Sequence, residues 1–457
     1  MGIARKIRGD EFYSQMIKLV VPIVIQNILN AAISSADVVM LKFVGQSAIS
    51  AVSLATQYAN ILFSVFFGLG TGVTMLCAQY YGKGDLKAID IVQGIAMRFA
   101  IISSVAFALA ALFIPELMMR VFTSDEELIK VGVEYIRWIS ISYLCMGIIE
   151  VYMSVLRSIG RVAICTILNV GAFFVNIGIN SIFIFGLFNA PKIGAQGVAI
   201  ATSATRLMEL VGCIIISINS KDVKLAVKSI FIRNKVLFKD FVRLSLPALF
   251  NDVVWGLGFS MYSVIIGHLG SDAVAANSFV VVARNFGTIL CFGIAGGGTI
   301  LLGNILGENK LDLARIYAKR ILKMTIIGGI VGGLMVVAAI PFIVVYAKNT
   351  LTATAIHYLK IMLLINGYYI SGTAVNTVLI AGVFRAGGDS KFGLICDIID
   401  MWVYAVPLGL ISAFILKLPV LVVYFLLCTD EFVKWPWVFK RYKSEKWLKN
   451  ITREDIY

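Results

Sequence analysis

The stretch that decides the fold is an apolar run near the N-terminus, which returns in altered form in the middle of the chain. Residues 17–41 read IKLVVPIVIQNILNAAISSADVVML, and residues 242–266 read VRLSLPALFNDVVWGLGFSMYSVII. Each run is long enough to cross a bilayer as a helix, which takes roughly 20 apolar residues. A signal peptide has a shorter apolar core, about 7–15 residues long. Residues 17–41 therefore predict a first spanning helix rather than a cleaved leader.

The composition extends this prediction to the whole chain. Of 457 residues, 59% are hydrophobic and 14% are charged, whereas a soluble protein carries roughly 25% charged residues. This shortfall excludes a water-soluble enzyme or a nucleic-acid-binding module and favours an all-α membrane protein. The seven cysteines are scattered through apolar stretches without CxxC spacing, so no disulfide or metal framework is indicated. The expected spans cover residues 14–41, 51–78, 91–115, 132–156, 163–188, 194–218, 241–267, 276–303, 321–347, 354–383, 391–416 and 418–438.

The net charge of +14 follows a pattern along the chain. About 29 of the 40 Lys and Arg residues fall in the termini and the even-numbered loops, and positive residues stay on the cytoplasmic side. Twelve spans with this bias predict that both termini are cytoplasmic in the plasma (inner) membrane. The basic residues then meet anionic lipid rather than nucleic acid. The densest basic cluster follows the sixth span and contains Lys221, Lys224, Lys228, Arg233, Lys235, Lys239 and Arg243.

An internal repeat divides the chain into two halves. A shift of 225 places Pro22 on Pro247 and Gly45 on Gly270, and it places the pair Gly68/Gly72 on Gly293/Gly297. Six spans separate the copies, so both halves have the same orientation and are related by an axis along the membrane normal. We expect two six-helix lobes: an N-lobe at 1–218, a basic linker at 219–240, a C-lobe at 241–440 and a cytoplasmic tail at 441–457. A cavity between two such lobes is typical of a transporter. The GxxxG pairs predict faces where helices pack closely.

Polar residues inside the N-half spans point to a cation site. A charged residue in mid-span costs at least ~2.5–3.5 kcal/mol, so Asp37 is expected to face a cavity and bind an ion, a proton or a cationic substrate. Asn176 and Asn180 share one helical face, and with the Thr202 hydroxyl they provide hard oxygen ligands that suit Na⁺. Two alternatives stay open: Asp37 lies at a helix end near the surface, and the asparagines only link helices by hydrogen bonds.

The C-half has its own intramembrane charges. Asp252 lies one turn from Trp255, and a carboxylate beside an aromatic ring attracts organic cations. Asp397 is either a second site carboxylate or a partner for the basic loop at 385–391. Arg284 has no local partner, so a carboxylate on another helix is expected, with Asp252 as the candidate.

Several motifs together resemble the multidrug and toxic compound extrusion (MATE) transporters, in particular the prokaryotic branch with an aspartate on the first helix. They are Pro22-Ile-Val-Ile-Gln-Asn27 followed by Asp37, Gly45…Ala51-Val-Ser-Leu-Ala55, Gly194-Ala-Gln-Gly-Val-Ala-Ile-Ala-Thr202, Asn251-Asp-Val-Val-Trp255 and Arg385-Ala-Gly-Gly-Asp389. The resemblance implies a V-shaped pair of six-helix lobes that exports cationic or amphipathic compounds in exchange for Na⁺ or H⁺. It also implies an N-lobe cation site at Asp37, Asn176, Asn180 and Thr202.

The chain departs from the family pattern at three positions. Asn180 stands where relatives often have an aspartate, which leaves Asp37 as the one titratable group of the site. Trp255 and Ala374 stand where some members have the Glu and Asp of a C-lobe ion site. Asp252 and Asp397 are the candidate substitutes, and the candidates for the substrate cavity are Gln26, Trp255 and Arg284.

Secondary antiport is thus the expected function, with Na⁺ or H⁺ as the coupling ion, no cofactor, no metal beyond possible Na⁺ at Asp37, and a monomeric protein. A lipid-linked oligosaccharide flippase of the same superfamily is the alternative, with Arg206 and Arg284 as its sequence support. A membrane-embedded enzyme is not expected, because no catalytic set is clustered at one membrane face. A passive channel would transport without an ion gradient.

Overall fold

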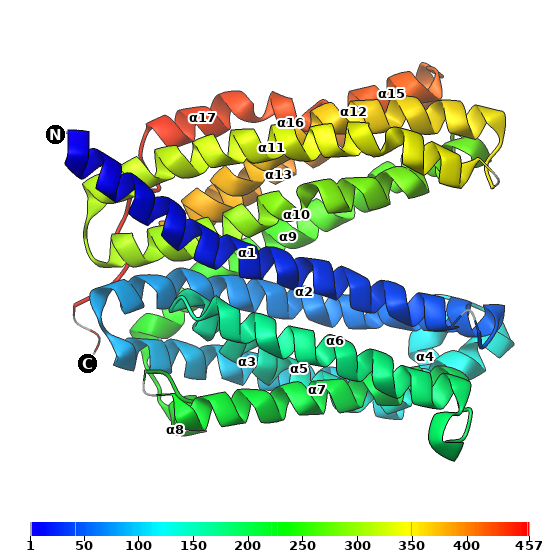
Figure 1. Ribbon diagram of the computed structural model, residues 1–457, viewed down its shortest axis with the longest axis horizontal. Helices are drawn as coiled ribbons and strands as arrows, with labels where there is room; N and C mark the ends of the chain where they lie inside the picture. Colours follow the sequence, from blue (N-terminus) through cyan, green and yellow to red (C-terminus); the bar gives the residue numbers. More distant parts are fainter. Residues whose placement is uncertain are drawn as a thin grey trace. The chain divides into compact units, whose positions relative to one another are not determined.

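The computed structural model describes residues 2–456 apart from 42, 221, 226, 349 and 455, and apart from the side chains of 2–10, 34, 35, 38, 39, 46 and 227. Lys221 of the basic linker lies outside the described residues. Every regular element in the described part of the chain is a helix, and eleven of these helices are long and apolar enough to cross a membrane. The expected all-α membrane architecture is therefore confirmed (Figure 1).

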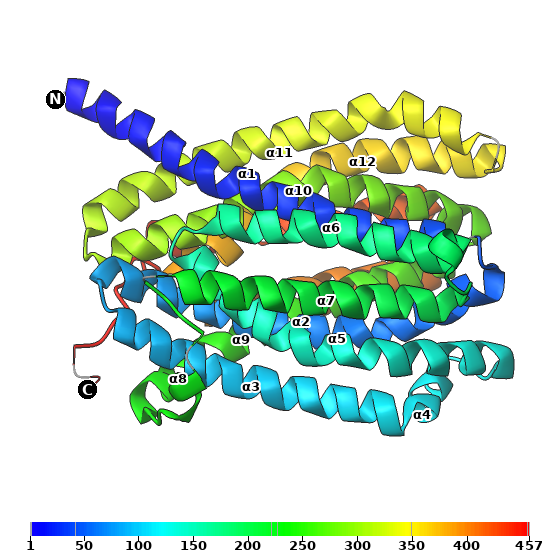
Figure 2. The same ribbon diagram turned by 60° about the horizontal axis from the view of Figure 1, so that its bottom comes forward.

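The helices of the first half are mostly long single elements. They are α1 (Gly2–Leu41), α2 (Gln46–Lys83), α3 (Leu86–Phe113), α4 (Pro115–Arg120), α5 (Glu126–Ser158), α6 (Val162–Phe185), the short η1 (Leu187–Asn189), α7 (Gly194–Asn219) and α8 (Val227–Phe231). The helices α2, α3, α5, α6 and α7 run side by side in both views (Figures 1 and 2).

The second half begins with long helices and ends with interrupted ones. They are α9 (Lys235–Gly267), α10 (Ser271–Gly307), α11 (Leu311–Ala347), α12 (Ala353–Thr377), η2 (Val378–Phe384), α13 (Ser390–Asp397), η3 (Ile398–Ala405), α14 (Val406–Leu410), η4 (Ile411–Ile415), α15 (Val420–Leu427), α16 (Asp430–Val433) and α17 (Trp435–Lys443). Three of them, η2, η3 and η4, are π-helical, a wide-turn form that is frequent at functional sites.

The last expected span, 418–438, is not one continuous helix. It is divided into α15, α16 and the start of α17. The break falls at Thr429 and Lys434, on either side of the polar pair Asp430 and Glu431, whose side chains are buried. Pro436 lies in the first turn of α17, where a proline is tolerated because the first backbone N–H groups of a helix lack intrahelical partners.

The repeat seen in the sequence has a counterpart in the backbone. Gly45 precedes α2 with φ 140°, and Gly270 precedes α10 with φ 117°. The second matched loop agrees as well, since Gly160 has φ 82° and Gly388 has φ 77°. Residues with a side chain rarely adopt such positive φ values, so the glycines at these positions are explained by the same turn in each half.

The helix contacts divide the chain into two compact units that are discontinuous in sequence. One unit contains Met1–Val24 and Leu246–Thr452, and the other contains Ile25–Ser245 and Arg453–Tyr457. Both α1 and α9 therefore change unit close to their internal prolines, Pro22 and Pro247. The continuous lobes expected at 1–218 and 241–440 stay a prediction. Compared with them, residues 1–24 of the first half belong to the unit of the second half, and residues 241–245 of α9 belong to the unit of the first half.

Close packing at the repeated glycines accompanies this exchange. A Cβ atom on Gly72 of α2 would lie 1.6 Å from the Ser245 Oγ of α9. At the equivalent glycine of the other unit, a Cβ on Gly297 of α10 would lie 3.0 Å from Val20 Cγ2 of α1. Since Val20 and Ser245 are themselves 225 positions apart, the same contact is made twice. Gly72, Gly293 and Gly297 of the two GxxxG pairs thus lie at close-packing faces, as their spacing predicts.

Candidate functional site

The N-half cluster forms where α1 meets α6. Asn180 donates through Nδ2 to Asp37 Oδ1 at 2.7 Å and to Asn176 Oδ1 at 3.1 Å. Both asparagines are fully buried, at 1% and 0% exposure. They lie four residues apart on one face of α6, so a single helix presents both amides to Asp37. The structure therefore brings together three of the four residues expected at the cation site.

Two buried oxygens, one on α6 and one on α7, have no hydrogen-bond partner among the described residues. They are Asn180 Oδ1 and Thr202 Oγ1. Thr202 lies on α7, which packs closely on α6: a Cβ on Gly212 of α7 would lie 2.5 Å from Leu168 Cδ2. A buried polar atom left without a partner costs about 1–3 kcal/mol. Oxygens of this kind fit a hard cation, which is bound by carboxylate, amide and hydroxyl oxygens.

The C-half contains a larger network of buried charges, centred on Lys434. The Lys434 ammonium is 2% exposed and lies 3.1 Å from Glu431 Oε2, 3.2 Å from Asp397 Oδ1 and 3.3 Å from Asp400 Oδ2. Asp397 ends α13, and Asp400 lies in the π-helical η3. One cation from the broken last span is therefore surrounded by carboxylates from three elements, α13, η3 and α16.

Hydrogen bonds extend this network from Asp397 to Asp252. Asn251 Nδ2 donates to Asp397 Oδ2 at 2.5 Å, while the buried Arg385 donates through Nη2 to Asn251 Oδ1 at 2.9 Å and to Asp252 Oδ1 at 2.8 Å. The expected pairing of Asp252 with Arg284 is therefore wrong. Asp252 pairs with Arg385, a helical residue that directly follows η2 and contacts α9 in the folded chain, and residue spacing does not reveal this proximity.

A third part of the network surrounds Asp430. Tyr262 donates its hydroxyl to Asp430 Oδ2 at 2.7 Å, Tyr369 does so at 3.4 Å, and Asn376 Nδ2 donates to Glu431 Oε2 at 2.6 Å. Sequence reasoning missed Asp430, Glu431 and Lys434, although all three lie inside the span expected at 418–438. Three charged residues within five positions of an intramembrane segment were the available signal.

The network contains more carboxylates than bases. Its acidic members are Asp252, Asp397, Asp400, Asp430 and Glu431, and its basic members are Arg385 and Lys434. Burying unpaired charge is costly, so this part of the protein depends strongly on each of its two cations.

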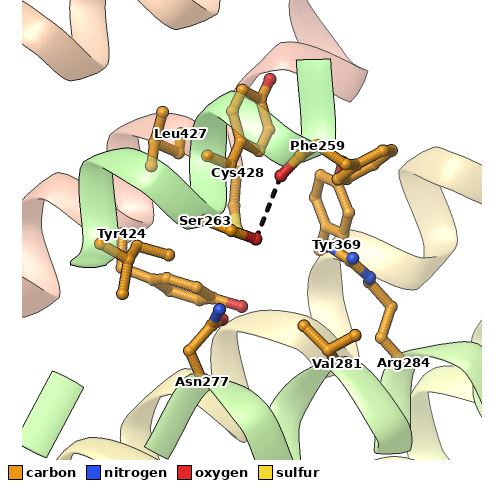
Figure 3. Close-up of a pocket in the computed structure, with 11 residues that line it drawn as sticks. Phe259, Ser263, Asn277, Val281, Arg284, Tyr369, Tyr424, Leu427 and Cys428 are labelled. Atoms are coloured by element: carbon orange, nitrogen blue, oxygen red, sulfur yellow. Dashed lines mark hydrogen bonds between the residues drawn. The ribbon is translucent and has the colours of Figure 1, made fainter. Parts of the chain in front are cut away.

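A pocket lies beside this network, within the same compact unit (Figure 3). Its lining includes the aromatic residues Phe259, Tyr262, Tyr369 and Tyr424 and the polar residues Ser263, Asn277 and Arg284. The Arg284 guanidinium carbon lies 4.4 Å from the centroid of the Phe259 ring. Trp255, an expected cavity residue, packs against the same ring at 4.5 Å between centroids but is not part of the lining.

Gln26 and Arg206 have partners close by. Gln26 is buried, and its Nε2 donates to Thr166 Oγ1 at 2.8 Å and to the Val162 carbonyl at 3.3 Å. These bonds join α1 to α6 and occupy the amide group that was expected to line a substrate cavity. Arg206 donates to Glu209 at 2.8 Å, one turn away on α7.

One family model matches the chain in two separate ranges. The family model MatE matches residues 22–182 and again residues 247–411. The two matches begin at Pro22 and Pro247, so the family comparison recovers the same repeat of 225 residues.

Curated relatives and solved structures agree over nearly the whole chain. The uncharacterized transporter YisQ of Bacillus subtilis (strain 168) is 23% identical over 98% of this chain and 97% of its own length. The probable multidrug resistance protein NorM of Thermotoga maritima is 23% identical over 98% of this chain and 96% of its own. The fold is similar to that of a MOP superfamily transporter from Pyrococcus furiosus Vc1, with a TM-score of 0.84 at 18% identity, covering 94% of this chain and 96% of that one.

Proposed function

Because this chain belongs to the MatE family, a family of multi-pass membrane transporters rather than enzymes, we propose that it is a secondary active antiporter. It exports cationic or amphipathic organic compounds in exchange for Na⁺ or H⁺ by alternating access. Relatives named as probable multidrug resistance proteins support the substrate class. The observation that carries the coupling is the buried cluster of Asp37, Asn176 and Asn180, in which Asn180 Oδ1 has no hydrogen-bond partner among the described residues.

The cluster has the chemistry that ion coupling needs. Asp37 supplies its one carboxylate, so binding either Na⁺ or H⁺ neutralises the charge of the whole cluster. The carbonyl of Asn180 and the hydroxyl of Thr202 supply neutral oxygens that are buried and unpartnered. One cation moving down a membrane potential of 100 mV releases about 2.3 kcal/mol, enough for roughly a 50-fold gradient of substrate.

The two C-half candidates have different surroundings. Asp252 is paired with Arg385, and Asp397 is paired with Lys434. A cation that binds at either carboxylate competes with a fixed positive charge, whereas Asp37 has a neutral amide as its hydrogen-bond partner. We therefore assign the coupling ion to Asp37 and keep Asp252 and Asp397 as candidates for a second site.

In the proposed arrangement the protein is a monomer in the plasma membrane, with both termini cytoplasmic and no cofactor besides the coupling ion. The basic bias of the even-numbered loops supports this orientation. The flippase alternative has little support, because one of its two arginines, Arg206, is neutralised by Glu209.

Transport in proteoliposomes tests the assignment, using a fluorescent organic cation and either a sodium gradient or a pH gradient imposed separately. We expect one of the two gradients to drive export in the wild type, and we expect Asp37→Asn to abolish that export at equal reconstituted amounts of protein. Asp125→Asn is the matched control, because Asp125 caps α5 at an exposed position and asparagine caps helices equally well. Undiminished gradient-driven export by Asp37→Asn would contradict the assignment.

A further inference from the structure

Arg284 has no carboxylate partner among the described residues, although the five acidic side chains of the buried network lie in the same unit. Asp252 pairs with Arg385, and Asp397, Asp400 and Glu431 surround Lys434. Asp430 accepts hydrogen bonds from two tyrosines. The guanidinium of Arg284 lies instead over the face of Phe259, at 4.4 Å from its centroid. An arginine inside an expected span is costly unless it serves a partner or a ligand.

The pocket in front of Arg284 combines this charge with aromatic walls. Phe259 and Arg284 are partly exposed, while the rings of Tyr369 and Tyr424 are buried behind them. Figure 3 shows the Arg284 side chain reaching from α10 toward Phe259 and Tyr369, with Asn277 beside Tyr424. The empty space of the pocket, its open side included, is about 340 Å³, and walls of aromatic and aliphatic side chains with a few placed polar groups are typical of small-molecule sites.

Asp430 is hydrogen-bonded to tyrosines of the pocket lining, and these bonds keep its carboxylate from facing the pocket. Tyr262 and Tyr369 line the pocket, and both donate their hydroxyls to Asp430 Oδ2, at 2.7 and 3.4 Å. These hydroxyl protons are therefore committed to Asp430 rather than to a ligand. The charge that the pocket itself presents is the positive charge of Arg284, with the Asn277 amide as a neutral hydrogen-bonding group.

We propose that this pocket, here called the Arg284 pocket, binds the carboxylate-bearing aromatic part of a transported compound. A guanidinium offers a planar pair of N–H donors that matches a carboxylate, and the rings of Phe259 and Tyr424 contact the aromatic group. The inference rests on the proposed transport function and narrows its substrate class. Compounds that carry an acidic group as well as an apolar body are recognised in this half, whereas a lone cation is repelled.

Calorimetric titration of the purified full-length protein in nanodiscs tests this inference with three ligands of one shape. They are naphthalene-2-carboxylate, its neutral carboxamide and 2-naphthylmethylammonium. We expect the carboxylate to bind at least about tenfold more tightly than the carboxamide. Arg284→Gln should remove this preference and leave the carboxamide affinity unchanged, which also shows that the variant is folded. Arg284→Lys should keep part of the preference, because it keeps the charge but loses the paired donors.

Arg320→Gln is the matched control, since Arg320 also lies over aromatic rings in this unit, 5.5 Å from the centroid of Phe12, but outside the pocket. It should bind all three ligands as the wild type does. The proposal is overturned if Arg284→Gln keeps the preference, if the ammonium compound binds most tightly, or if the wild type binds none of the three. Binding needs no ion gradient, so these outcomes are independent of the loss of export that tests Asp37.

Discussion

Replacing Lys434 by methionine removes the cation at the centre of the C-half network while keeping a side chain of similar length. The ammonium lies 3.1–3.3 Å from carboxylate oxygens of Glu431, Asp397 and Asp400. At an effective dielectric constant of 20, each such contact amounts to about 5 kcal/mol before the cost of desolvation. Desolvation offsets most of this sum, and removing one partner of a buried ion pair costs about 3–5 kcal/mol in measured cases.

The charge balance of the network identifies a second substitution that should restore part of the stability lost in Lys434→Met. The wild-type network has five carboxylates and two bases, an excess of three acids, and Lys434→Met raises the excess to four. The second substitution Glu431→Gln returns the excess to three. It also leaves Asn376 Nδ2 an oxygen to donate to, because the bond at 2.6 Å goes to Glu431 Oε2. The double variant should therefore be more stable than Lys434→Met alone.

The apparent melting temperature of the detergent-solubilised protein, followed at one fixed heating rate, measures these changes. We expect Lys434→Met to lower it by at least about 6 °C. The control Lys440→Met removes an exposed lysine of α17, the helix that directly follows Lys434, and should shift the melting temperature by about 1 °C or less. The reasoning is refuted if Lys434→Met melts with the wild type, or if the double variant is less stable than Lys434→Met.

Two further predictions concern packing and pH. Gly72→Ala should lower the free energy of unfolding by about 1–3 kcal/mol, because the new Cβ would lie 1.6 Å from Ser245 Oγ. The double variant Gly72→Ala/Ser245→Gly should recover part of this loss in the same melting assay. No recovery would show that another contact is responsible. Hydrogen bonds from Arg315 lower the pKa of Glu445 below its ordinary value of 4.5. This exposed ion pair therefore stabilises the protein above pH 4.5, and its contribution is lost as the pH falls through the lowered pKa. Glu445→Gln should therefore lower stability only slightly at pH 7, because the pair is exposed, and its cost should shrink as the pH falls through the lowered pKa. An equal cost at pH 7 and at acid pH would contradict the ion pair.

Much of the fold was predictable because it depends on local properties of the chain. The length and apolarity of each segment predict a spanning helix, and the repeat is found by aligning the sequence with itself. The last span was predicted less well. Its hydropathy favoured one helix over 418–438, but Asp430, Glu431 and Lys434 lie within that range, and their buried partners on other helices accompany its division into α15, α16 and α17.

The candidate site was predictable where the partners lie on adjacent turns of one helix. Asn176 and Asn180 are such a pair, and the structure adds the bond from Asn180 to Asp37 across 143 positions of sequence. The partner of Asp252 was predicted wrongly, because both Arg284 and Arg385 were available and spacing along the chain does not distinguish them. Only the packing of the end of η2 against α9 decides that Arg385 is the partner.

The sequence alone thus determined that this protein is an all-α membrane protein built from two copies of one pattern, with acids and amides placed inside its spans. Hydropathy and helical periodicity are properties of neighbouring residues, so they need no tertiary structure. Only the tertiary structure decided which charges neutralise one another around Lys434, which segments of α1 and α9 exchange between the compact units, and that Arg284 is left facing an aromatic pocket. These features depend on contacts between residues far apart in the chain, which form only when the helices pack together.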